Sequence, residues 1–250
     1  MVSQKYIEGL ARKHGTPLFI ISKSRLMDEA KRFRAYLPRV TPYYAVKANQ
    51  HPGILKTLAQ AKLGFDVAST QEIASVLSMG VSPERLIFAN TIKRVDALKF
   101  AQKHGVRLMT FDSEYELNKI ARYVPRAEVL VRIKVPNVGS MVELSLKFGA
   151  EPADAIPLLI KAHRLGLKPV GVSFHVGSQC THVENYLDAF EMTSIILRDA
   201  SLKQLPLEIV DIGGGFPIRH LRSDEDIFAK MAPVINKELD RLFDPTVRLI

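Results

Sequence analysis

The first residue whose type and setting suggest chemistry is Lys47, in the segment YYAVKAN. Its neighbours are apolar or aromatic, and no acidic residue lies close to it in the sequence. Burial disfavours the ammonium form, so a lysine in such a strand is expected to have a lowered pKa. The neutral amine is the form that attacks a carbonyl group to give a Schiff base. The alternative is a lysine at a strand end that extends its ammonium group to solvent.

A run of three glycines, Gly213-Gly214-Gly215, follows the apolar segment that ends in Asp211-Ile212. Without Cβ atoms, the backbone amides of such a run can approach an anion closely. The segment is not a P-loop, because the lysine and the Ser or Thr that should follow are missing, and it lacks G-x-G-x-x-G spacing. The sequence therefore predicts either a phosphate-binding turn or a plain glycine turn.

Other polar residues are predicted to lie at the ends of strands. In the segment FHVGSQ, His175 can lie flat against an aromatic cofactor and Ser178 can offer a hydroxyl to phosphate, although a hydrogen-bonded core histidine is the alternative. Asp66 and Arg132 come from two further strands and belong either to the same site or to a structural ion pair. Glu72 has an evident structural role at a helix start, so a functional role needs further support.

Short β-branched or aromatic runs alternate with amphipathic stretches along the chain, without hairpin signals, which indicates a parallel sheet. Eight such strands favour a closed (β/α)8 TIM barrel, with a ninth strand, Pro17–Ser22, outside it. The helices Gln71–Met79 and Glu114–Tyr123 are expected behind the capping boxes Ser69–Glu72 and Ser113–Glu116. The eight barrel strands are predicted at Tyr43–Ala48, Gly64–Ser69, Leu86–Asn90, Val106–Phe111, Val129–Val135, Val170–Val176, Leu207–Ile212 and Val247–Ile250.

This order of elements brings the lysine, the histidine, the serine and the glycine turn to the same end of the barrel. Phosphate sites in these barrels are often built from the loops after strands seven and eight. Together the four features describe a phosphorylated aromatic aldehyde held by its lysine, which is pyridoxal 5′-phosphate (PLP).

Composition limits the classes of partner. The 250 residues are 47% hydrophobic, and 35 basic residues against 26 acidic ones give a net charge of +9. The basic residues are scattered, with no interleaved aromatic stripe, so we expect no nucleic-acid partner. No run is long and apolar enough to span a membrane, and the N-terminus has no signal-peptide core. The lone Cys180 excludes an internal disulfide framework and a multi-cysteine metal site, so we expect a cytoplasmic protein without a metal.

The chain resembles the fold-type III PLP-dependent decarboxylases, which include ornithine, lysine, arginine and diaminopimelate decarboxylases and share an alanine racemase-like barrel. The motifs PYYAVKAN, GFDVAS followed by QE, LIFANTIK, FDSEYEL, LVRI, LSLKFG, FHVGSQ and DIGGGFP carry the resemblance, which looks closest to the ornithine decarboxylase branch. It implies that Lys47 forms the Schiff base and that His175 stacks on the pyridine ring. It further implies that Ser178, Gly213, Gly214 and Gly215 bind the phosphate. Asp66, Glu72 and Arg132 would orient Lys47 and the pyridine ring.

The resemblance also implies the reaction, which is decarboxylation of a basic L-amino acid. Ornithine is the favoured substrate and would give putrescine. The assembly that the resemblance implies is a homodimer with shared active sites. Residues 23–250 would be the PLP-binding barrel, and residues 1–22 a helix and strand associated with a C-terminal β-domain. Because the last strand ends at Ile250, we expect a barrel truncated in strand eight, without that β-domain and with weak or no catalysis by itself. The alternatives are lysine, diaminopimelate or arginine as substrate, racemisation, a single-domain PLP carrier, or a non-catalytic regulatory homologue.

Overall fold

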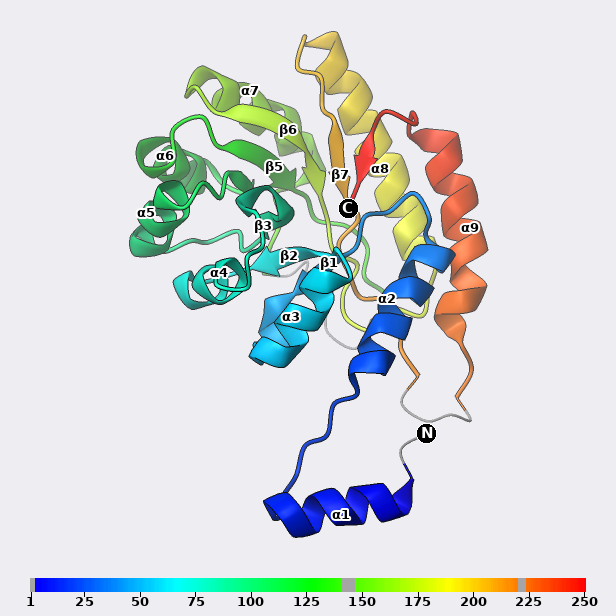
Figure 1. The fold of residues 1–250 in the computed structure, drawn as a ribbon. Coiled ribbons are helices and arrows are strands. Elements are labelled where there is room, and N and C mark those ends of the chain that lie inside the picture. The colour runs from blue at the N-terminus through cyan, green and yellow to red at the C-terminus, as the bar shows by residue number, and fades with distance from the viewer. Residues whose placement is uncertain (1–2, 141–146, 220–223) are drawn as a thin grey trace.

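The structure is a computed structural model that describes residues 3–140, 147–219 and 224–250. Among these residues, eight parallel strands form one sheet in which each strand pairs with the next along the chain (Figure 1). The sheet curls back on itself, because Val40 and Leu249 form a parallel bridge and the Thr41 N–H donates to the Leu249 carbonyl at 2.9 Å. The predicted (β/α)8 barrel is therefore confirmed. Its strands are β1 Tyr43–Ala45, β2 Gly64–Val67, β3 Leu86–Phe88, β4 Leu108–Phe111, β5 Glu128–Arg132, β6 Lys168–Ser173, β7 Ile209–Asp211 and β8 Arg248–Leu249.

The helices lie outside the ring of strands, and from β1 onwards they alternate with the strands along the chain (Figure 1). They are α1 Gln4–His14, α2 Lys23–Tyr36, α3 Pro52–Gln60, α4 Thr70–Leu77, α5 Val95–Lys103, α6 Glu114–Tyr123, α7 Ala155–Arg164, α8 Glu184–Leu202 and α9 Ile227–Leu242, with short 3-10 helices at Val46–Ala48, Pro83–Arg85 and Pro152–Asp154. No helix in the described ranges combines the length and the apolar character that a membrane crossing requires.

Two apolar layers hold the barrel together. A small cluster fills its interior, formed by Ile87, Leu108, Leu130, Ile209 and Ile250. The larger layer lies between the strands and the helices and contains most of the buried apolar side chains. Each fully buried leucine, isoleucine or phenylalanine contributes about 1.5–3 kcal/mol relative to an exposed one, so this double layer supplies the main stabilisation of the fold.

The predicted helix starts are confirmed only in part. Ser69 and Ser113 are the N-caps of α4 and α6, and each side chain accepts a hydrogen bond from the backbone of the glutamate three residues later. The carboxylates do not complete the capping boxes. Glu72 accepts from the Ala68 N–H at 2.7 Å, and Glu116 accepts from the Lys93 N–H at 3.2 Å. Both glutamates therefore tie their helix to the loop before it or beside it.

The strand predicted at Tyr43–Ala48 is too long. β1 ends at Ala45, and the next three residues form a 3-10 turn in which the Asn49 N–H donates to the Val46 carbonyl at 3.1 Å. The local i→i+3 hydrogen bond replaces pairing with β2, so the chain turns before Lys47. Lys47 consequently follows the strand instead of lying inside it.

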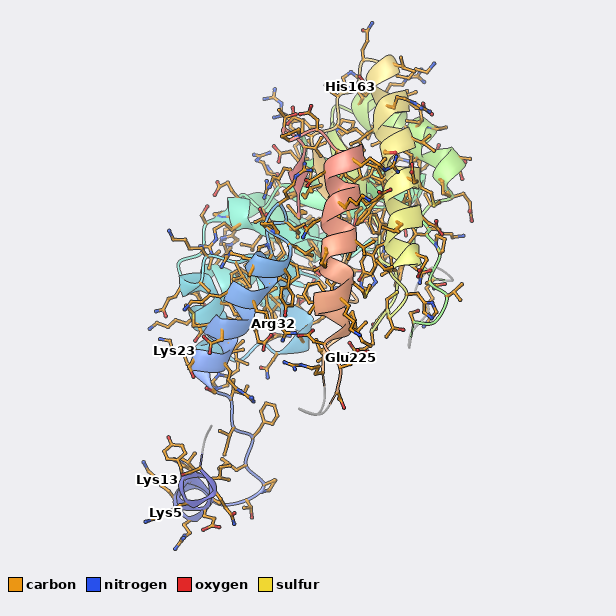
Figure 2. All side chains as sticks on the ribbon, turned by 90° about the vertical axis from the view of Figure 1, so that its right-hand side faces the viewer. Lys5, Lys13, Lys23, Arg32, His163 and Glu225 are labelled. Atoms are coloured by element: carbon orange, nitrogen blue, oxygen red, sulfur yellow. The ribbon has the colours of Figure 1, made fainter. Side chains whose placement is uncertain are left out.

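The prediction of a strand at Pro17–Ser22 is wrong, since this segment has no regular structure. A strand needs a hydrogen-bonding neighbour, and none of the described residues pairs with this segment. Its apolar side chains are exposed, Phe19 by 82%. The predicted helix before it is α1, which buries no residue and lies away from the barrel, as Lys5 and Lys13 show (Figure 2).

The contact between β6 and β7 leaves no room for a side chain at Gly171. A Cβ atom there would lie 1.9 Å from the Ile209 carbonyl oxygen. We expect Gly171→Ala to push the two strands apart and to lower the free energy of unfolding by about 1–3 kcal/mol or more. Gly9 on α1 has no atom within 4 Å of its Cβ position, so Gly9→Ala is the matched control and should cause no loss. Urea unfolding of both variants measures the difference, and equal stabilities would contradict the prediction.

Candidate active site

A cavity of about 690 Å³ opens at the carboxyl end of the barrel strands. Its volume lies in the range of small-molecule and cofactor sites. Most of the residues predicted from the sequence line it, namely Lys47, Asp66, Glu72, Arg132, His175, Gly213, Gly214 and Gly215. The structure thus brings together residues from five strand ends that are up to 168 residues apart in the sequence.

Lys47 lies in the turn after β1 and lines the cavity, as predicted, but it is exposed and not buried. The turn carries it past the end of the strand to the open side of the cavity, which is why the expected burial fails. No ion pair joins it to a carboxylate in the described part of the chain. Its positive charge acts on the nearby Asp66, whose pKa it lowers. The amine is therefore accessible and has no fixed salt-bridge partner.

A cluster of opposite charges lies beneath Lys47. Burial raises the pKa of Asp66 to about 7, with the carboxylates of Asp211 and Glu72 acting in the same direction and Lys47 and Arg132 acting against it. A carboxyl group with this pKa exchanges a proton near neutral pH, which is typical of residues in active sites. This pKa favours a role for Asp66 in the site over the alternative of a purely structural ion pair.

Asp211 is the residue of this cluster that the sequence reasoning missed. One oxygen of its carboxylate accepts from the Gly213 N–H at 2.9 Å, and the other accepts from the Ser173 hydroxyl at 2.8 Å. Burial raises its pKa, whereas these two hydrogen bonds and Arg132 lower it. It is the first residue of the DIGGG motif and lies two residues before the glycine turn, so its position at the end of β7 was a usable signal.

Arg132 ends β5, and its guanidinium group stacks over the ring of Phe148 at 5.3 Å from the ring centre. The segment that carries Phe148 is fixed by the Gly149 N–H, which donates to Asp112 at 3.0 Å. Burial lowers the pKa of Arg132, and the neighbouring carboxylates oppose this shift. Phe148 belongs to the LSLKFG motif, of which residues 144–146 lie outside the described residues.

His175 follows β6 and is half-buried. Its Nδ1 accepts a hydrogen bond from the Gly177 N–H at 2.9 Å, so in the neutral ring the proton is on Nε2. Burial lowers the pKa of His175 to about 4, and the positive charges of Arg132 and Lys47 add to this effect. The imidazole is therefore neutral at physiological pH, with its tautomer and ring orientation set by the following glycine.

The glycine turn lies against the loop that carries His175. Gly213 and Gly215 have φ angles of +70° and +91°, and a Cβ atom on them would lie 2.1 Å from the Phe174 carbonyl and 1.8 Å from the Gly177 carbonyl. Any larger residue would push the two loops apart. The N–H groups of Gly214 and Gly215 donate to no described residue, although both glycines line the cavity. Free amides in such a turn are the groups that bind phosphate.

Ser178, also predicted for the phosphate, does not line the cavity. Its loop nevertheless lies beside the turn, because the Gly177 carbonyl approaches Gly215 and the Cys180 N–H donates to the Gly215 carbonyl at 2.7 Å. The structure therefore places the backbone on both sides of Ser178 against the glycine turn, while the hydroxyl's role stays a prediction.

Residues 23–250 match the protein-family model described as "Pyridoxal-dependent decarboxylase, pyridoxal binding domain". The chain belongs to this decarboxylase family. A probable ornithine decarboxylase of Dictyostelium discoideum is 40% identical over 232 residues, which are 93% of this chain and 50% of that protein. Antizyme inhibitor 2 of Xenopus laevis is 41% identical over 225 residues, which are 90% of this chain and 49% of that protein. The chain thus spans about half the length of these curated relatives.

The fold agrees with solved members of the family. A crystal structure of an SrLDC mutant in complex with PLP has a TM-score of 0.93 and 39% identity, and the match covers 100% of this chain and 65% of that one. The family's domain and this neighbour confirm PLP as the cofactor that the sequence predicts.

The cavity of this pyridoxal binding domain fits the group. It offers an amine without a salt-bridge partner, a neutral imidazole, and free amides in a turn that no Cβ atom obstructs. These are the partners that an aldehyde, an aromatic ring and a phosphate require.

Two groups of the site should affect stability in opposite directions as the pH changes. His175 has a pKa of about 4 in the folded protein and 6.5 ordinarily, so the unfolded chain binds more protons between these values and stability rises with pH. Asp66 has a pKa of about 7 against 3.8, so the folded protein binds more protons and stability falls as pH rises through that window.

If one of the two groups is removed, the change of the free energy of unfolding with pH should reflect the other group. We expect the free energy of unfolding to rise more steeply with pH in Asp66→Asn than in the parent protein, and less steeply in His175→Asn. Urea unfolding between about pH 4.5 and about pH 6.5 measures both slopes. His163→Asn, on the exposed side of α7, is the matched control. Equal slopes in all four proteins would show that neither shift exists.

Proposed function

We propose that the whole protein is a PLP-dependent carboxy-lyase that converts a basic L-amino acid into the corresponding diamine. The favoured substrate is L-ornithine, which gives putrescine. The observation that carries this proposal is that the exposed Lys47, the neutral ring of His175 and the glycine turn with its free amides line the same cavity. Membership in the decarboxylase family supports the reaction class.

PLP, when bound, supplies an aldehyde that condenses with amines and a ring that accepts electrons from a breaking bond. In this proposal Lys47 Nζ would be the protein's amine that holds the cofactor. His175 would offer its neutral ring to the aromatic ring of the cofactor, and the Gly213–Gly215 turn and Ser178 would hold the phosphate. Asp66, whose pKa is near 7, releases or accepts a proton beside Lys47, with Glu72 and Arg132 setting the local charge.

Ornithine is the proposed substrate because a similar protein carries the name probable ornithine decarboxylase. Lysine, diaminopimelate and arginine are the alternatives within the same reaction. A second candidate function is regulatory and non-catalytic, and the 41% identity to antizyme inhibitor 2 favours it. The accessible Lys47 in an intact site supports the enzyme over this alternative.

We further propose a homodimer in a cytoplasmic protein. Four large apolar side chains are exposed at the same end of the barrel as the cavity. Three lie in loops after strands, and the fourth lies in the first turn of α6, so that four different strands precede them. They are Ile92, Tyr115, Val138 and Ile218. An exposed apolar rim of this kind is typical of protein–protein interfaces. Similarly, the exposed segment 18–21 supports the assignment of residues 1–22 to contacts with a further domain in the whole protein.

The cofactor proposal is tested by the visible absorption of lysine-bound PLP. We expect PLP to give this band with the parent protein and with Lys56→Ala, which removes an exposed lysine of α3 as the matched control. Lys47→Ala should lose the band completely, since no other amine of the described residues faces the cavity. An unchanged spectrum in Lys47→Ala would end the proposal.

The reaction is tested on the whole protein with a panel of ornithine, lysine, arginine and diaminopimelate, by release of labelled CO2. We expect the highest kcat/KM for ornithine and no release from Lys47→Ala. Release from another member of the panel alone would reassign the substrate. Retained PLP binding without any release would favour the regulatory candidate.

A further inference from the structure

Tyr186 holds the glycine turn from behind. It lies on α8, is 0% exposed, and its hydroxyl donates to the Gly214 carbonyl at 3.0 Å. Its ring stacks on Phe216 with 5.1 Å between ring centres and 11° between planes. Tyr186 does not line the cavity, whereas Gly214 and Phe216 do. The turn therefore lies between the tyrosine and the cavity.

The hydrogen bond fixes the direction of one peptide unit. In a trans peptide the carbonyl and the following N–H point in opposite directions, so the Gly215 N–H points away from Tyr186. On the next peptide unit, the Gly215 carbonyl is held by the Cys180 N–H at 2.7 Å. Both peptide units that flank the Gly215 Cα are thus anchored by donors that do not line the cavity.

Anchors matter here because glycine has no conformational preference of its own. Residues without a Cβ atom populate positive and negative φ with similar ease, so a free glycine run can rotate its peptide units. Gly213 is held at its N–H by Asp211, but Gly214 has no such restraint apart from the tyrosine hydroxyl. Burial also keeps this hydroxyl protonated, since it raises the pKa of Tyr186 above its ordinary value of 10. It remains a donor throughout the physiological range.

We propose that Tyr186 is a positioning residue for the cofactor's phosphate, whose hydroxyl holds the Gly214–Gly215 peptide so that the Gly215 amide faces the cavity. The inference rests on the proposed function, because it needs PLP in this cavity. It adds a residue that touches neither cofactor nor substrate and acts only through the backbone of the turn.

A purely structural role is the competing explanation, because the ring of Tyr186 also packs in an aromatic cluster with Phe190 and Phe216. Tyr186→Phe separates the two, since it keeps the ring and removes only the hydroxyl. Tyr36→Phe is the matched control. It also removes one hydroxyl, which donates to Asp226 at 3.2 Å between α2 and α9, outside the cavity lining.

The experiment compares PLP with pyridoxal, which lacks the phosphate, by equilibrium titration of the parent protein and both variants. We expect Tyr186→Phe to weaken PLP binding about three- to tenfold and to leave pyridoxal binding unchanged, as for the loss of one oriented hydrogen bond. Inorganic phosphate should compete with PLP less well by a similar factor. Tyr36→Phe should keep the PLP-to-pyridoxal affinity ratio of the parent protein.

The outcomes distinguish this inference from the function on which it rests. An unchanged ratio in Tyr186→Phe, with normal PLP binding by the parent protein, overturns the positioning role alone. An equal loss for PLP and pyridoxal also overturns it, because a disturbed fold weakens both ligands. If the parent protein binds no PLP, the proposed function fails and this inference fails with it.

Discussion

The site depends on one close contact, that of the turn after β7 with the loop after β6. Gly213 lies against the Phe174 carbonyl and Gly215 against the Gly177 carbonyl at distances that no Cβ atom could occupy. The two loops can therefore lie backbone to backbone at the carboxyl end of the barrel. This approach leaves Gly214 and Gly215 in the cavity lining beside His175. Glycine is required here by space and by positive φ, so its high conformational freedom must be removed by neighbours.

The charges at the base of the cavity follow from the same geometry. Parallel strands end at one edge of the barrel, so polar residues that terminate β2, β5 and β7 are brought close together without being adjacent in sequence. Asp66, Arg132 and Asp211 meet there, and the positive charge of Arg132 partly compensates both carboxylates. Burial keeps the pKa of Asp66 high in spite of two cations. A carboxyl group that can change its charge near neutral pH is thus placed below an amine that has no fixed partner.

Short-range patterns predicted much of this protein, and contacts between distant segments explain what they missed. The barrel follows from apolar runs and serine caps that are visible in the sequence, and the triple glycine and Lys47 mark the cavity. The prediction of a strand at Pro17–Ser22 was wrong because β-propensity cannot supply a pairing partner. The prediction that Lys47 is buried was wrong because a 3-10 turn ends β1 early. The role of Tyr186 could not be predicted from the sequence, since it depends on a hydrogen bond to a carbonyl group 28 residues away.

Glu116 shows why such distant contacts can still serve the site. Its carboxylate forms an ion pair with the buried Lys93, whose ammonium group also donates to the Thr110 carbonyl. The Thr110 hydroxyl in turn donates to the carbonyl of Ala89, which lines the cavity. A buried ion pair adds little net stability, because desolvation offsets the attraction between the charges. Its effect is instead geometric: it joins the start of α6 to the loop after β3, so that a helix outside the barrel fixes the loop whose first residues line the cavity.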